Sequence, residues 1–258
     1  MTSNPREKQP SILGMRIDTT SYEETCATIL GWQASNENRT VCFANVHMAM
    51  TAYDSPGFRG MINDADLVTP DGMPLVWTLR LMGYKEQNRV YGPTLTDRLL
   101  GLVEEADIPI GFLGSTPEVI EKLQEQILHK HPAIRIVYAF SPPFRSLDEE
   151  ETQAIIDQIN YSKARILFVG LGCPKQEIWM HENKGSVGAV MLGVGAAFDF
   201  IAGKKRQAPL WIQHIGMEWF YRLMTEPNRL MKRYVYNNPR FIIAVTRELI
   251  GRQFNKNK

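Results

Sequence analysis

Short apolar runs alternate with longer amphipathic stretches along most of this chain. The alternation is clearest in the second half, where apolar runs at 108–113, 134–139, 166–169 and 187–194 are separated by stretches of helical periodicity. Uninterrupted apolar runs of this length are typical of strands that are buried on both faces. Strands that alternate with helices predict a Rossmann-like α/β fold, with a mostly parallel sheet and helices on both faces.

The first part of the chain continues the same rhythm after a polar start. Residues 1–10 lack the apolar core of a signal peptide, and we expect them to be disordered. Ser21 followed by Glu24 has the pattern of a capping box, which predicts that a helix begins there. The remaining expectations are strands at 11–20, 41–44 and 66–69, a helix and a turn at 46–59, and helices at 21–35, 75–82, 94–106, 118–129, 147–161 and 176–183.

The character of the chain changes after Gly203. Aromatic residues and methionines there alternate with basic residues, which predicts two or three amphipathic helices. Their breaks are expected at Pro209, Pro227 and Pro239. The chain therefore divides into an α/β domain at 11–203 and a C-terminal helical appendage at 204–258. The apolar faces of this appendage are typical either of a membrane surface or of packing, including a homo-oligomer interface.

Charge is distributed unevenly between these two parts. Residues 204–258 contain 12 Lys or Arg against 3 Glu, a net charge of +9, so the rest of a chain with total charge +1 carries −8. A basic appendage favours contact with anions such as phosphates or anionic lipid. No apolar stretch reaches the length of a membrane span, so any membrane contact is expected to be peripheral. The spacing of the three cysteines suits neither a disulfide framework nor a metal site.

Candidate chemistry gathers where the predicted strands end. In parallel α/β sheets ligands bind beyond the carboxyl ends of the strands, and the residues there are rich in Gly, Asn, Asp and Gln. We therefore expect one shared pocket. Its candidate loops are Asn45, Asp71-Gly72, Gly114-Ser115-Thr116, Gly170 to Gln176, and Gly193 to Asp199. Each also has a purely structural interpretation, because Asn45 and Thr116 can cap helices and Asp71-Gly72 can form a simple turn.

The segment from 166 to 179 has the most specific local pattern. A buried strand leads into Gly170 and Gly172, and Pro174 then suits the first turn of a helix that contains Gln176. A strand, a glycine turn and a helix N-terminus form the geometry in which backbone N–H groups receive a phosphate. The segment therefore predicts a site for a phosphate-bearing ligand.

Other motifs are absent or weak. The chain contains no Walker A motif, no HExxH and no GxSxG, and Gly193-x-Gly195 falls short of GxGxxG. A dinucleotide-dependent oxidoreductase is therefore kept only as an alternative. Asp64-Ala65-Asp66 resembles a DxD metal motif, but it more simply flanks the following strand. Nucleic-acid binding through the basic appendage is the least favoured interpretation, since the rest of the chain is acidic.

Seven blocks in order resemble the WecG/TagA/CpsF family of bacterial glycosyltransferases, from about Ile12 to Arg233. The blocks are Asp66 to Pro74, Arg89 to Gly92, Gly111 to Gly114, Gly170 to Glu177, Gly193 to Asp199, Arg206 to Trp211, and Gly216 to Arg229. Each block alone is weak, but their common order is highly specific. The sequence departs from the family pattern at Phe43, where a Thr is common two residues before Asn45.

The resemblance implies an enzyme that transfers a sugar from a UDP-sugar to a polyprenyl-diphosphate-linked saccharide at the cytoplasmic face of the membrane. Transfer in the family inverts the anomeric configuration and is regarded as independent of metals, so no cofactor is expected. Its pathways build cell-surface polysaccharides and exopolysaccharides. The family pattern places the catalytic aspartate at Asp71. Phe43 cannot supply the hydroxyl that a Thr offers to the donor.

Inverting transfer needs a base for the acceptor hydroxyl and positive groups for the leaving diphosphate. Asp71 is the candidate base, and burial would raise its pKa toward a useful value. The candidate donor-binding residues are Asn45, Arg89, Gly114, Gly172, Gln176 and Asp199. The candidates for the acceptor diphosphate are Arg222, Arg229 and Arg233.

Overall fold

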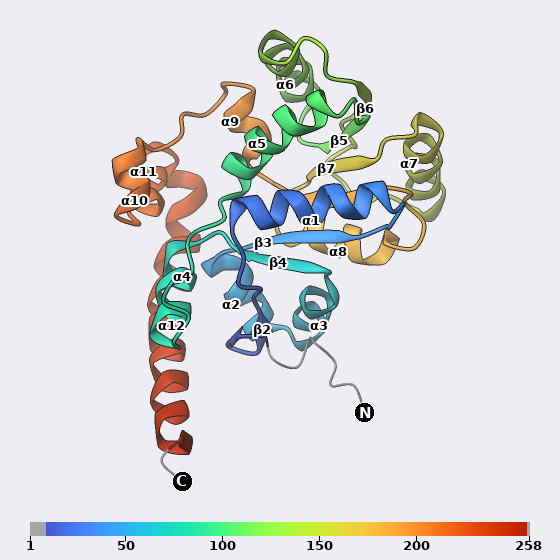
Figure 1. Ribbon diagram of the computed structural model, residues 1–258. Coiled ribbons are helices and arrows are strands. Elements are labelled where there is room, and N and C mark those ends of the chain that lie inside the picture. Colours follow the sequence, from blue (N-terminus) through green and yellow to red (C-terminus); the bar gives the residue numbers. More distant parts are fainter. Residues whose placement is uncertain (1–8, 257–258) are drawn as a thin grey trace, which may run out of the picture.

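The computed structural model describes residues 9–256 and places a parallel sheet at the centre of the molecule (Figure 1). Residues 1–8, which the sequence predicts to be disordered, lie outside the described part. The main sheet has six strands, all parallel, in the order β4-β3-β8-β7-β5-β6. Its strands are β3 (Thr40–Ala44), β4 (Leu67–Pro70), β5 (Ile110–Gly114), β6 (Ile136–Phe140), β7 (Ile166–Gly170) and β8 (Val190–Gly193). The predicted Rossmann-like α/β fold is confirmed.

Helices cover both faces of this sheet and bury two apolar cores (Figure 1). One core is formed with α1 (Tyr22–Ala34), α5 (Gly92–Glu105), α6 (Pro117–Lys130) and α9 (Ala197–Ile201). The other is formed with α2 (Val46–Asp54), α3 (Pro56–Asp64), α4 (Met73–Leu81), α7 (Glu149–Ser162) and α8 (Lys175–Asn183). The predicted capping box is present, because Ser21 accepts from Glu24 N and the Glu24 carboxylate accepts from Ser21 N.

Two predictions for the first sixty residues were wrong. The strand expected at 11–20 is a separate antiparallel hairpin of β1 (Ser11–Ile12) and β2 (Met15–Arg16). Leu13 and Gly14 both have positive φ, which turns the chain before a longer strand can form. The segment 46–59 enters a second helix instead of ending in a turn. Ser55 accepts a hydrogen bond from Phe58 N, and Pro56 takes the first helical position, so α3 begins immediately after α2.

The appendage consists of α10 (Leu210–His214), α11 (Glu218–Thr225) and α12 (Pro227–Lys256). The long helix α12 runs beside α4 and α2 and projects beyond the sheet (Figure 1). Its residues Phe241 and Val245 are buried in the same core as α2. Polar contacts add to this packing, since Arg240 forms an ion pair with Asp54 at 2.6 Å. In the part of the chain that the structure describes, no helix is both long and apolar enough to span a bilayer.

The break expected at Pro239 is absent, because α12 continues through this proline. A proline inside a helix removes one hydrogen bond, here the one to the carbonyl of Val235 four residues earlier. Val235 is 64% exposed, so water can satisfy this carbonyl. The solvent-facing position explains why the helix tolerates Pro239.

Candidate active site

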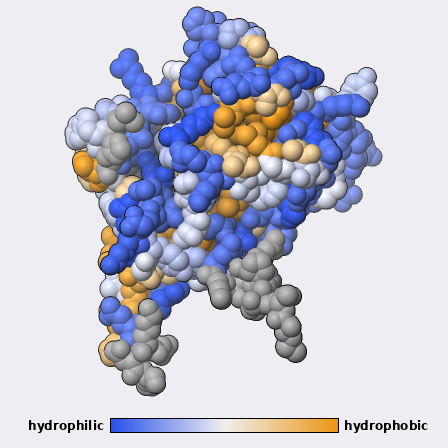
Figure 2. Space-filling view, viewed as in Figure 1, coloured by the Kyte–Doolittle hydropathy of each residue, from blue (hydrophilic) through white to orange (hydrophobic). Residues whose placement is uncertain are grey.

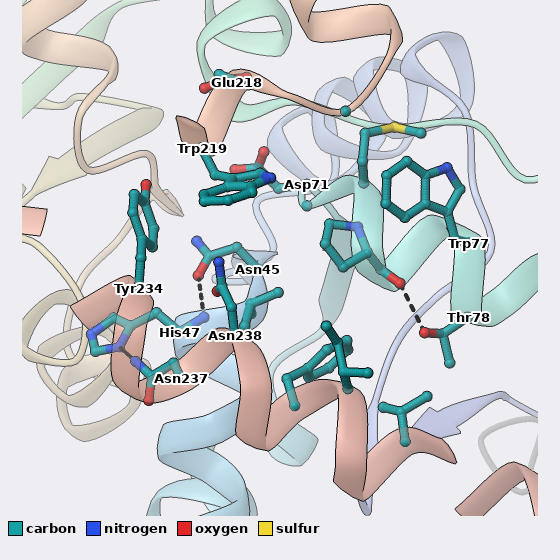
Figure 3. A pocket seen from close by; sticks show the side chains of 18 of the residues that line it. Asn45, His47, Asp71, Trp77, Thr78, Glu218, Trp219, Tyr234, Asn237 and Asn238 are labelled. Carbon is teal, nitrogen blue, oxygen red and sulfur yellow. Dashed lines mark hydrogen bonds between the residues drawn. The ribbon is translucent and has the colours of Figure 1, made fainter. Parts of the chain in front are cut away.

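A cavity of about 640 Å³ lies at the carboxyl ends of β3 and β4, beneath α11 and α12 (Figure 3). Five residues that the sequence predicts for the site line it together, although they come from distant parts of the chain. They are Asn45, Asp71, Arg89, Arg222 and Arg233. The α/β domain thus supplies the first three and the appendage supplies the other two. The cavity is complete only when the appendage is packed against the sheet.

Asp71 is held at the end of β4 by the neighbouring strand. The backbone N–H groups of Asp71 and Gly72 both donate to the carbonyl of Ala44, at 2.9 and 3.0 Å. A side chain at position 72 would come within 3.2 Å of the Asn45 backbone, so the close approach of the two strand ends favours glycine there. The turn that the sequence allows at Asp71-Gly72 is therefore also what aims the carboxylate into the cavity.

The environment of Asp71 is suited to a general base. Burial raises the pKa of its carboxyl to about 6, while the nearby Arg89 guanidinium lowers this pKa and the Glu218 carboxylate raises it. The Arg89 Nη2 atom lies 3.2 Å from Asp71 Oδ1, and Arg89 Nε donates to the Asp71 backbone carbonyl. A carboxylate with a pKa just below neutral is ionised at pH 7 and still accepts a proton readily.

Arg89 is clamped between two carboxylates. Its Nη1 atom lies 2.7 Å from Glu218 Oε2, and its guanidinium stacks over the Tyr91 ring at 3.9 Å. The Tyr91 hydroxyl in turn donates to Glu218 Oε1 at 2.9 Å. Burial alone would lower the pKa of Arg89, but Asp71 and Glu218 raise it, so this guanidinium stays charged. Its predicted contact with the donor diphosphate would have to be made alongside these partners.

Glu218 and Tyr91 were not predicted as functional residues. Both occur in the blocks that resemble the family, but the two positions are 127 residues apart along the chain. Their contact depends on how α11 packs over the sheet, which hydrophobic periodicity does not encode. A glutamate in the first turn of an amphipathic helix reads simply as an exposed charge.

The two appendage arginines of the cavity are half-buried cations that form no ion pair with a carboxylate among the described residues. Within the described residues neither Arg222 nor Arg233 forms an ion pair, and the Nε atom of each is buried without a hydrogen-bond partner. Burial lowers the pKa of Arg233, and the nearby charges of Arg222 and Arg229 lower it further. Two half-buried guanidinium groups that line one cavity, each with an unpartnered Nε, favour an anionic ligand, because a partly desolvated charge is stabilised by a counter-charge.

Arg229 has a different environment. Its side chain is 51% exposed and pairs with Glu226 at 2.6 Å, and it does not line the cavity. The structure therefore brings together two of the three arginines predicted for the acceptor diphosphate.

Asn45 combines both interpretations that the sequence allowed. Its Oδ1 atom caps α2 by accepting from the backbone N–H groups of His47 and Met48, at 3.0 and 3.2 Å. Figure 3 shows its amide nitrogen turned toward the cavity. His47 is adjacent, and burial lowers the pKa of its ring to about 4, so it adds no charge to the site at neutral pH.

The glycine turn after β7 is occupied by the side chain of Gln176, which comes from the helix that follows it, α8. Gly172 has φ +81°, as the predicted turn requires, and its N–H donates to Gln176 Oε1 at 3.1 Å. The Gln176 Nε2 atom donates to the Gly193 carbonyl and to Glu177 Oε1, both at 2.7 Å. Gln176 is only 4% exposed, and burial raises the pKa of Glu177 to about 7. Gln176 thus joins β7, α8 and β8.

The other predicted donor-site residues also lie outside the lining of the cavity at Asp71, at the ends of β5, β7 and β8. A side chain at Gly114, which has φ +126°, would come within 2.5 Å of the Gly170 backbone. Asp199 pairs with Lys205 at 2.5 Å, and Lys205 also contacts Glu226 of the appendage at 3.1 Å.

Acidic residues elsewhere do not gather into a metal site. The described residues contain no group of three or more His, Cys, Asp or Glu that could hold a metal ion. Asp64 and Asp66 precede β4, so they lie at the opposite end of this strand from Asp71. Asp66 pairs there with Lys184 and Arg39, both at 2.9 Å.

A parallel α/β sheet with a buried carboxylate at a strand end, facing unpaired arginines of the packed appendage, is suited to an enzyme acting on phosphate-bearing substrates. The chain belongs to the Glycosyl transferase WecG/TagA/CpsF family, whose profile matches residues 10–255. It is similar to an N-acetylglucosaminyldiphosphoundecaprenol N-acetyl-beta-D-mannosaminyltransferase from Bacillus spizizenii. The two are 28% identical over 211 residues, which cover 81% of this chain and 79% of that relative. The family resemblance seen in the sequence is confirmed, and the protein is a glycosyltransferase.

Proposed function

We propose that the protein transfers a sugar from a UDP-sugar, with inversion, to a saccharide linked to polyprenyl diphosphate. Such a reaction would serve the synthesis of a cell-surface polysaccharide or an exopolysaccharide. The observation that carries the proposal is a single cavity that contains the Asp71 base and the two unpaired arginines. The name of the Bacillus relative describes an acceptor of this class, a sugar on diphosphoundecaprenol.

In the proposed reaction Asp71 removes the proton from the acceptor hydroxyl as this oxygen attacks the anomeric carbon of the donor sugar. The new C–O bond forms on the face opposite the departing UDP, and the bond to the UDP oxygen breaks. The proton rests on Asp71 and then passes to solvent. Arg89 orients the carboxylate through its contacts with Asp71 and Glu218.

The donor would lie beside this base, across the strand ends. Its diphosphate would lie beside the turn of Gly172, whose own N–H is taken by Gln176 Oε1, with Arg89 facing it and the Asn45 amide reaching the sugar side. Asp199 would accept a hydrogen bond from the nucleoside. Gly114, Gly172 and Gln176 would shape this region, Gln176 through the turn that it holds. We propose that the reaction needs no metal ion.

The acceptor diphosphate would bind to the half-buried cations of the appendage. Arg222 and Arg233 line the cavity without an ion pair of their own, so a diphosphate would supply a direct counter-charge. Arg229, which pairs with Glu226, would lie outside this contact. Because the acceptor is embedded in a bilayer, we propose that the protein acts as a peripheral protein at the inner face of the cytoplasmic membrane.

A turnover screen tests the proposal. UDP-glucose, UDP-glucuronic acid, UDP-N-acetylmannosamine and its uronic acid would each be supplied with a synthetic lipid-diphosphate saccharide. We expect one donor to give product, with the inverted anomer in the NMR spectrum. Asp71→Asn should keep the fold and UDP-sugar binding but lose at least about 1,000-fold in kcat, in the range for loss of a general base. Retained turnover in this variant would exclude Asp71 as the base.

A further inference from the structure

The cavity does not end at the polar site but continues as an apolar groove between α4 and α12. Trp77 and Leu81 of α4 form one wall, and Ile242, Val245 and Leu249 of α12 form the other. Figure 3 shows Trp77 on α4 opposite α12. Leu81 and Ile242 are 75% and 63% exposed, which is high for large apolar side chains that line one groove. Such a concave apolar surface is typical of a binding site.

The groove offers few polar partners to a ligand. The Thr78 hydroxyl in its wall already donates to the Pro74 carbonyl at 2.8 Å, as Figure 3 shows. A ligand with many hydrogen-bonding groups, such as an extended peptide, would lose its contacts with water and gain little in return. A hydrocarbon chain has no such groups to satisfy. The lining therefore selects for an apolar, flexible occupant.

Both helices lead away from the proposed catalytic base. Helix α4 begins two residues after Asp71, and α12 presents Arg233 before Ile242 and Leu249. Along α12 the distance from Arg233 to Leu249 is about 24 Å, at about 1.5 Å per residue. A ligand that follows this path meets the proposed base, then half-buried cations, then an apolar groove. The matching ligand carries a hydroxyl, then an anionic group, then a hydrocarbon chain.

We propose that the groove between α4 and α12 binds the isoprenyl segment next to the diphosphate of the acceptor. This inference rests on the proposed function, because the arginines and Asp71 fix which end of the acceptor lies where. The first isoprene units would then leave the bilayer during the reaction and contribute to affinity. The protein would recognise the lipid directly, and would not use it only as an anchor in the membrane.

Soluble acceptors test the groove without a membrane. The same saccharide diphosphate would carry a prenyl, geranyl or farnesyl chain, in buffer free of detergent and lipid. Affinity for the full-length protein would be measured by calorimetry and by intrinsic tryptophan fluorescence, and kcat/KM by turnover. We expect affinity and kcat/KM each to rise about tenfold or more from prenyl to farnesyl, since each buried methylene adds to binding.

Neighbouring isoleucines on α12 provide a matched pair of variants. Ile242 lines the groove, whereas Ile243 is similarly exposed, at 53%, but does not. Ile242→Asn should flatten the dependence on chain length, and Leu81→Asn should do the same from the other wall. Ile243→Asn should preserve the dependence. Thermal unfolding would confirm that each variant is folded.

Three outcomes would overturn the inference. The first is equal affinity for prenyl and farnesyl acceptors, and the second is equal effects of Ile242→Asn and Ile243→Asn. The third is conversion of a dimer to a monomer by Ile242→Asn, which would show that the groove is an interface between two copies of the chain. Chain-length-dependent binding without transfer from any UDP-sugar would support the groove and count against the proposed donor. Transfer without chain-length dependence would leave the proposed reaction intact and exclude the groove.

Discussion

The catalytic proposal depends at the residue scale on the protonation of Asp71. Its pKa is raised to about 6, chiefly by burial, and the base must be ionised to accept a proton. We therefore predict that kcat/KM falls tenfold per pH unit below about pH 6 and is flat between pH 7 and 8. A pH–rate profile with a soluble acceptor would measure this limb. An acid limb near pH 4, the ordinary value for aspartate, would contradict the buried environment of Asp71.

Substitution of Glu218 should shift the acid limb of the pH–rate profile while Asp71 itself is unchanged. Its carboxylate raises the pKa of Asp71, so Glu218→Gln should shift the acid limb of the profile to lower pH. The variant keeps an acceptor for the Tyr91 hydroxyl but loses the ion pair with Arg89, and kcat/KM at pH 7.5 should fall about tenfold. Glu226→Gln is the control, because Glu226 lies at the opposite end of α11 and contacts Lys205 and Arg229. An unshifted limb in Glu218→Gln would argue against this tuning.

The two half-buried, unpaired arginines should contribute to acceptor affinity more than the exposed, paired one. Arg222→Gln and Arg233→Gln should each raise KM for the lipid-diphosphate acceptor roughly 10- to 100-fold, the range for a lost hydrogen bond to a charged group. Arg229→Gln removes a cation that is half exposed and paired with Glu226, so KM should change less than about threefold. Three equal effects would instead place the diphosphate at the rim of the cavity.

The sequence predicted Asp71 as the base, Asn45 and Arg89 for the donor, and Arg222 and Arg233 for the acceptor diphosphate, and the structure places all five around one cavity. The strand-end positions of Asn45 and Asp71 and the family resemblance, which extends to Arg233, were sufficient for this. The Glu218 clamp could not be predicted, because its contact with Arg89 arises only from the packing of α11 on the sheet.

At the scale of elements, the strand–helix alternation predicted every strand of the main sheet, because strands buried in a parallel sheet are encoded as short, nearly uninterrupted apolar runs. The β1–β2 hairpin was not predicted. Its turn needs positive φ at Leu13 as well as at Gly14, and a leucine gives no indication of this conformation in the sequence. At Pro239 the error was the reverse, because a helix break was predicted where α12 is continuous. Proline breaks helices on average, but its cost depends on whether the open carbonyl faces water.

The element that joins β7, α8 and β8 has its own test. Gln176→Ala removes three hydrogen bonds, two of them buried, and leaves Glu177 without its amide partner, which should destabilise the fold by about 2–4 kcal/mol. Thermal unfolding would measure this loss. Gln153→Ala, on the exposed face of α7, should change stability by less than about 0.5 kcal/mol. Reduced UDP binding with an unchanged melting temperature would instead assign Gln176 to direct donor contact.

At the scale of the whole molecule, the basic and apolar appendage lies at one end of the sheet and α7 lies at the other (Figure 1). Figure 2 shows apolar side chains along the part of α12 that projects from the body. On α10 and α11, Trp211 and Met224 are 64% and 68% exposed. Exposed apolar side chains among basic residues are suited to a bilayer that contains anionic lipid. The end that carries the cavity would then face the membrane.

Liposome binding tests this orientation. Combined Trp211→Ser and Met224→Ser should weaken binding to anionic vesicles about tenfold or more, because each side chain would lose apolar burial. Phe144→Ser with Tyr161→Ser is the matched control, since those side chains are 76% and 90% exposed but belong to the segment before α7 and to α7 itself, not to the appendage. Binding of the unmodified protein should also weaken as salt rises from 50 to 300 mM, because basic residues contribute to it. Equal losses in the two double variants would show that apolar exposure anywhere supports adsorption. The appendage would then have no special role as the membrane-facing end.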